Sequence, residues 1–143
     1  MGNKLGAKAT LKKLRRIVNE RGHEYVYEAP EYTDADGDLR QGDECYYTTP
    51  EGKPSCLVGA LLAVVAPGVL SKLNTYEWAE LYEDGGPHVV SVTDLHSERS
   101  QVSGVDLDDY FTRDALQILY RVQAEQDYGK SWGTAVDSAA DLI

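Results

Sequence analysis

The residue pair best suited to nucleophilic chemistry is Cys56 with His88. Cys56 precedes an apolar run, and a cysteine at the N-terminus of a helix has its thiolate favoured by the helix dipole. His88 begins a β-like stretch and could serve as the base. A cysteine beside an apolar helix also fits a small buried hydrophobe. The sequence therefore leaves a catalytic and a structural interpretation of Cys56 open.

Two patterns contain residues that could bind a metal, and neither has the required spacing. The turn Asp34-Ala35-Asp36-Gly37-Asp38 resembles a calcium loop in composition, but Leu39 and Cys45 stand where an EF-hand needs Gly and Glu. A solvated hairpin turn is the simpler interpretation. The potential zinc ligands lack zinc-site spacing. We predict neither a metal nor a cofactor; the zinc candidates considered are His23, His88, His96, Cys45 and Cys56.

Aromatic residues suggest a second kind of site, a partner-binding surface. The chain has ten tyrosines and two tryptophans but a single phenylalanine. Tyrosine combines a flat apolar ring with a polar tip and is enriched at protein interfaces. The alternative is that about half of these rings fill the core and keep their hydroxyls at the surface. Polar side chains near the end of the last long helix could cap a neighbouring helix or line a groove. The predicted binding residues are Tyr25, Tyr27, Tyr32, Tyr46, Tyr47, Gln123, Gln126 and Asp127.

Charge is distributed unevenly along the 143 residues. The chain carries 14 basic and 24 acidic side chains, a net charge of −10. Residues 1–21 account for +6 and residues 22–143 for −16. An acidic body repels phosphate, so we expect no nucleic-acid binding by that part. The basic segment could contact phosphate by itself. The simpler interpretations are that it docks onto the acidic body or forms a solvated helix face.

Periodicity predicts several helices. Leu11, Leu14 and Val18 share one face of a basic helix over about 4–21, ended by Gly22. That stripe could also pack on a second copy, giving a homodimer. A buried helix follows an N-cap at Ser55 and ends at Pro67, and a buried strand is the competing interpretation of this apolar run. A third helix is predicted to begin at a capping box at 74–77 and to end at 85. A fourth begins after a cap at Thr112 and ends at 129, and a short last helix follows a cap at Ser131.

Strand-like composition occurs at 23–28, 45–49 and 88–93, and residues 94–109 show no clear period. No linker, repeat or bilayer-spanning apolar run interrupts the chain. We therefore predict one α+β domain over 1–143. It should have four or five helices around a short antiparallel hairpin or three-stranded sheet.

Longer motifs resemble those of small accessory proteins from actinobacterial phages and prophages. They are Tyr46-Tyr47, GKPSCLVGAL at 52–61, FTRDAL at 111–116 and QAEQDYGKSWGTA at 123–135. The resemblance implies phage origin and the host cytoplasm, and it carries no catalytic residue. The short stretches 55–59 and 87–90 are similar to the cysteine and histidine segments of papain-like cell-wall amidases. That likeness would imply a cysteine hydrolase.

Three functions follow from these patterns. The leading prediction is a non-enzymatic phage accessory protein that binds a host or phage protein. An acidic mimic of DNA is the first alternative, with its carboxylates in 24–44 and 77–84. A cysteine hydrolase using Cys56 and His88 is the second.

Overall fold

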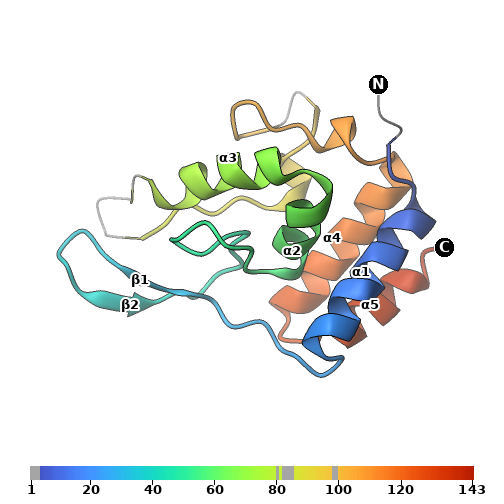
Figure 1. Cartoon of the computed structure of the whole chain (residues 1–143), viewed down its shortest axis with the longest axis horizontal. Coiled ribbons are helices and arrows are strands. Elements are labelled where there is room, and N and C mark those ends of the chain that lie inside the picture. The colour runs from blue at the N-terminus through green and yellow to red at the C-terminus, as the bar shows by residue number, and fades with distance from the viewer. Residues whose placement is uncertain (1–3, 80, 82–85, 98–99) are drawn as a thin grey trace.

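The computed structural model describes residues 4–79, 81, 86–97 and 100–143 (Figure 1). Within them lie five α-helices and one two-stranded antiparallel hairpin, so the predicted α+β class is confirmed. The three-stranded alternative is wrong for these residues. The helices are α1 (Ala7–Arg21), α2 (Leu57–Val65), α3 (Pro67–Trp78), α4 (Arg113–Asp127) and α5 (Trp132–Ala140), and the strands are β1 (Glu31–Thr33) and β2 (Leu39–Gln41).

Three of the helices, α1, α4 and α5, pack side by side at one end of the molecule (Figure 1). Helix α1 buries Thr10, Leu14 and Val18 against its neighbours, as its apolar stripe predicts. It begins at Ala7 and not near residue 4. Helices α4 and α5 start at their predicted caps, where the hydroxyls of Thr112 and Ser131 accept backbone amides.

The middle of the chain departs from the prediction at two helix starts. Helix α2 forms as expected, but its N-cap is Cys56, because Ser55 still lies in the preceding segment and donates its amide to Tyr47. The chain then breaks at Ala66, and Pro67 begins α3 at once. The predicted capping box at 74–77 is wrong, since these residues lie inside α3. The helix end predicted at 85 falls outside the described residues.

The strands lie elsewhere than predicted. Strands β1 and β2 pair around the acidic turn, with Tyr32 opposite Arg40. Segment 23–28 forms one isolated bridge, because the carbonyls of Tyr25 and His23 accept the first backbone amides of α5. Segment 45–49 likewise pairs locally instead of joining a sheet, and 88–93 leads into a 3₁₀ turn at Val92–Asp94.

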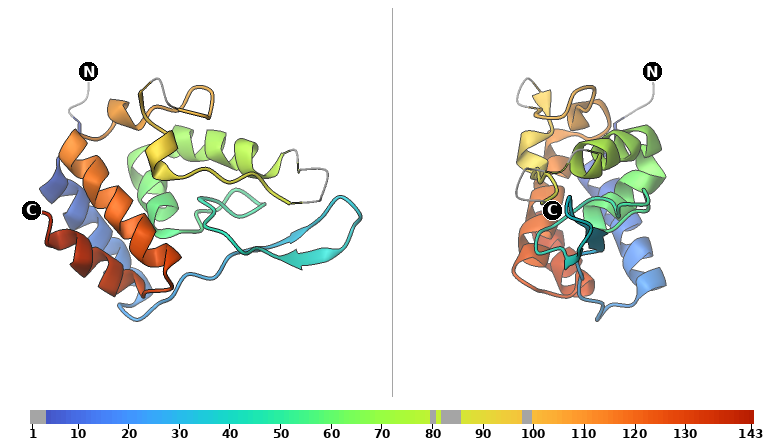
Figure 2. Two further views of the ribbon diagram at one scale, coloured as in Figure 1. Left: turned by 180° about the vertical axis from the view of Figure 1, so that it is seen from behind. Right: turned by 90° about the vertical axis from the view of Figure 1, so that its left-hand side faces the viewer.

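The hydrophobic core joins the helix layer to α2, α3 and the irregular segment 90–111. That segment had no period in the sequence, yet its apolar side chains are buried. The hairpin projects away from the core at the end opposite α1 (Figure 2). Among the described residues, no helix is both long and apolar enough to cross a membrane. Large buried side chains include Leu14, Leu57, Leu61, Leu62, Leu73, Leu95, Leu107, Phe111, Ile118 and Trp132.

Candidate functional site

The projecting segment 28–44, which we call the acidic arm, consists of the hairpin and its two connections to the body. It contains seven acidic side chains and one arginine, a net charge of −6. The turn is built on Asp34, whose carboxylate accepts the amides of Asp36 (2.9 Å) and Asp38 (3.0 Å) and pairs with Arg40 (2.6 Å). The turn of the arm is therefore held in a defined conformation by the Asp34 carboxylate.

The same contacts occupy the most buried carboxylate of this turn, which the sequence offered as a calcium ligand. Arg40, followed by the amide of Asp38, holds the pKa of Asp34 below its ordinary value. That carboxylate is engaged by the hairpin itself, while Asp36 and Asp38 are exposed to solvent. In the part of the chain that the structure describes, no three His, Cys, Asp or Glu side chains gather into a metal-binding group.

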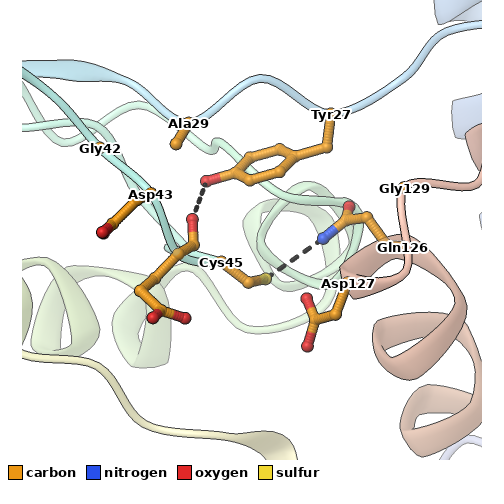
Figure 3. Close-up of a pocket in the computed structure, with 9 residues that line it drawn as sticks. Tyr27, Ala29, Gly42, Asp43, Cys45, Gln126, Asp127 and Gly129 are labelled. Atoms are coloured by element: carbon orange, nitrogen blue, oxygen red, sulfur yellow. Dashed lines mark hydrogen bonds between the residues drawn. The ribbon is translucent and has the colours of Figure 1, made fainter.

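A hollow of about 330 Å³ lies on one side of the base of the arm (Figure 3). Tyr27 crosses it, donating its hydroxyl to the carbonyl of Glu44 (3.2 Å) and accepting the amide of Tyr46 (3.0 Å). Burial raises the pKa of the Tyr27 phenol, so it remains a neutral tether. The lining residues are Tyr27, Ala29, Gly42, Asp43, Glu44, Cys45, Gln126, Asp127 and Gly129.

Cys45 is the thiol that borders this hollow. Gln126 Nε2 lies 3.2 Å from its sulfur, on the side where α4 reaches the hollow (Figure 3). A hydrogen bond with Cys56, followed by burial, raises the pKa of the Cys45 thiol well above its ordinary value. Nucleophilic cysteines need an accessible thiolate. Cys45 therefore acts as a neutral hydrogen-bonding group.

Gln123 and Gln126 serve the fold from inside. Gln126 Oε1 accepts the amide of Leu57 at 3.0 Å and thereby caps α2, as one of the two predicted roles requires. It also borders the hollow, which is the other role. Gln123 accepts the amide of Val92 (2.9 Å) and donates to the hydroxyl of Tyr47 (3.0 Å). Both glutamines are buried, whereas Asp127 is exposed and its pKa is raised by partial burial.

A second hollow, of about 340 Å³, opens on the other side of Asp43 and Glu44. Tyr32 from the arm contributes to its wall, and its ring lies 5.5 Å from that of Trp78. The Tyr46 ring packs on the same tryptophan at 5.0 Å. Asp43 and Glu44 thus stand between two concave surfaces at the point where the arm joins the body.

The predicted binding tyrosines do not share one surface. Tyr27 and Tyr32 border the two hollows. Tyr46 and Tyr47 are 1% and 0% exposed, so the prediction that they contact a partner is wrong. Their rings fill the core, because the segment lies between α3 and α4 instead of at a sheet face. Tyr25 lies at another place, edge-on to Trp132 at 4.7 Å and beneath Arg21.

The structure does not present Cys56 as a nucleophile. Its side chain is 0% exposed, and its sulfur accepts the amide of Gly59 as the cap of α2. His88 lies beside the C-terminal part of α3, with its ring 5.5 Å from that of Tyr76. A substrate cannot reach a sulfur with no exposed surface. The predicted position at a helix start is correct, but the geometry favours the structural interpretation.

Glu77 is an important residue that the sequence prediction assigned to the wrong role. Its carboxylate is fully buried and accepts the amides of Tyr47 (2.8 Å) and Thr48 (3.1 Å), together with the Thr48 hydroxyl (2.7 Å). Burial raises the pKa of Glu77 to about 7. The spacing in the sequence could have indicated this burial, since Leu70, Leu73 and Glu77 lie at i, i+3 and i+7 on one buried stripe of α3.

Compared with known protein families, curated proteins and solved structures, the chain matches none of them.

Proposed function

We propose that this protein acts by binding another protein, without catalysis, through the acidic arm and the two hollows at its base. The observation that supports the proposal most directly is the projection of a shaped, charged hairpin away from the core (Figure 2). Strands β1 and β2 pair only with each other among the described residues, and Leu39 on β2 is 70% exposed. An exposed hairpin edge offers backbone groups to a partner.

The charge of the arm indicates the kind of surface that would bind it. The exposed acids Glu31, Asp36 and Asp38 have no cation in contact among the described residues, because Arg40 is paired with Asp34. Such a surface attracts a basic partner and speeds encounter at low ionic strength. The phage-type motifs support a host or phage protein in the host cytoplasm as that partner.

A capture experiment with matched charge variants tests this proposal. Tagged wild-type protein would be incubated with nuclease-treated host lysate, and retained proteins identified by mass spectrometry. In the arm variant E31Q/D36N/D38N, three exposed arm acids are neutralised. The control E20Q/E51Q/D109N neutralises three exposed acids outside the arm, so both variants carry the same net charge. We expect wild type and control to retain the same protein in stoichiometric amount, and the arm variant to lose it.

Equal retention by all three proteins would contradict the role of the arm. Duplex DNA added to the captured complex separates the DNA-mimic alternative, since a mimic is displaced by DNA in a salt-sensitive manner. The variant C56A addresses the hydrolase alternative, which predicts loss of activity in this variant with partner binding intact. Because the Cys56 thiol of the wild type is buried, we expect partner capture by C56A to be unchanged.

A further inference from the structure

A second charged surface, on α1, is not explained by the proposed function. We define the basic face as Lys8, Lys12 and Arg16, all of which are exposed. Lys8, Lys12 and Arg16 follow one another at four-residue intervals, about 6 Å apart along the helix axis. Beside them is a shallow hollow of about 460 Å³, bordered also by Leu11. The face is therefore an elongated strip of positive charge.

The acidic body does not neutralise this strip. Among the described residues, no carboxylate forms an ion pair with Lys8, Lys12, Lys13 or Arg16. Arg15 alone of the α1 cations makes such a pair, with Asp137 at 3.0 Å. Both expectations for the basic segment hold in part, because α1 packs on α4 and α5 and pairs Arg15 with Asp137, whereas its basic face is solvated.

The chain contains its own complement to this face. Residues 1–21 carry a net +6, and the acidic arm carries a net −6. The two charged segments lie at opposite ends of the molecule, with α1 in the helix layer and the hairpin pointing away from it (Figure 1). One molecule therefore cannot bring its own arm onto its own α1.

We propose that the basic face of α1 binds the acidic arm of a second copy of this chain. The inference rests on the proposed function, because it uses the arm as a binding surface. A second copy is a partner that the chain itself supplies, since its arm presents a net charge of −6 on a hairpin that points away from its core. Nucleic acid is the alternative that the experiment below separates.

The geometry of this contact determines the kind of assembly. The contact joins two different surfaces, so each added copy leaves one free arm and one free basic face, and association continues head to tail unless a ring closes. A partner bound to the arm would occupy the surface that a second copy needs. Self-association and partner binding are therefore mutually exclusive at each arm.

Complementation between two neutralised variants tests the pairing. The helix variant K8Q/K12Q/R16Q removes the basic face, and the arm variant E31Q/D36N/D38N removes the arm charge. Controls are K53Q/R113Q/K130Q and E20Q/E51Q/D109N, each with three exposed charges neutralised outside the two surfaces. All substituted side chains are exposed, so the fold should persist. Mass would be measured by sedimentation velocity over a range of concentrations, at about 50 mM and about 500 mM salt.

At low salt, we expect the average mass of the wild type and of both controls to rise with concentration above the monomer mass of 15.8 kDa. High salt should return each to monomer. Each test variant alone should stay monomeric. Their equimolar mixture should form a 1:1 dimer and nothing larger, because one intact basic face then meets one intact arm.

Three results would overturn the inference: wild type monomeric at low salt, helix variant still associating, or no dimer in the mixture. Binding of duplex DNA by wild-type protein, lost in the helix variant without any self-association, would assign the basic face to polyanions instead. Arm-dependent capture of a lysate protein by a monomeric wild type would leave the proposed function standing while this inference fails. If the protein neither captures a lysate protein through its arm nor self-associates, both the proposed function and this inference are wrong.

Discussion

Glu77 is a buried carboxylate that takes the place of a β-strand partner. The segment around Tyr47 and Thr48 has strand-like residues but finds no strand beside it, and two of its amides need acceptors. Glu77 supplies both oxygens from α3, and Trp78 Nε1 donates to the carbonyl of Thr48 at 3.0 Å. No cation accompanies the carboxylate among its contacts in the described residues. Burial therefore raises its pKa, although its hydrogen bonds oppose the shift.

The raised pKa of Glu77 predicts that the free energy of unfolding falls as the pH rises. Its pKa is raised in the folded state from 4.5 to about 7, so between these values the folded protein holds a proton that the unfolded chain has lost. The contribution is fully present below the unfolded pKa and is lost as pH rises through about 7. Its size is at most about 3 kcal/mol.

Urea unfolding of wild type and E77Q at about pH 5 and about pH 8 measures this contribution. The glutamine does not titrate, so the difference in unfolding free energy between the two proteins isolates the group. We expect wild type to lose about 1–3 kcal/mol relative to E77Q between the two pH values. Parallel pH profiles would show that Glu77 titrates normally.

At the scale of elements, the helices with their own local signals were predictable and the strands were not. Helices α1, α4 and α5 have apolar stripes, and α4 and α5 also have the hydroxyl caps predicted from the sequence. Segments 23–28 and 45–49 have β-like composition, but tertiary contacts satisfy their backbones: the start of α5 for one, Glu77 and the start of α2 for the other. β-Propensity reports a fit to a half-buried surface and does not identify the partner.

The candidate site was predictable to a similar extent. The polar capping role of Gln126, and the position of Tyr27, Tyr32 and Asp127 at the surface hollows, follow from residue type and position. The burial of Tyr46 and Tyr47 depends on where α3 and α4 pass, which no local pattern states. The hollows arise only when the ends of the arm meet the end of α4, a juxtaposition of segments about 80 residues apart in the chain.

The link between α4 and α2 gives the prediction at this scale. Replacing Gln126 by alanine leaves the buried amide of Leu57 without an acceptor, and an unsatisfied buried donor costs about 1–3 kcal/mol. The variant Q117A is the matched control, since Gln117 lies on the same helix but is exposed and should change stability by less than about 0.5 kcal/mol. Chemical denaturation of both variants measures the difference. Equal effects would contradict the capping role.

At the scale of the whole molecule, the core and the proposed binding surface occupy separate parts of the chain. The core lies among the helices and the segment 90–111, whereas the hairpin residues are mostly exposed. The two ends of the hairpin are already joined at its base, because the amide of Gly42 donates to the carbonyl of Pro30 at 3.0 Å. The hairpin residues 31–41 can therefore be removed without opening the body.

A variant in which Gly-Gly replaces residues 31–41 tests this separation. The Pro30–Gly42 hydrogen bond would then close a four-residue β-turn. The lost ring contact between Tyr32 and Trp78 is worth about 0.5–1.5 kcal/mol, so the Tm should fall by less than about 8 °C with a single cooperative transition. Partner capture and head-to-tail association should both disappear. Thermal unfolding followed by circular dichroism measures the first expectation, and a variant that melts without cooperativity would show that the arm belongs to the folding unit after all.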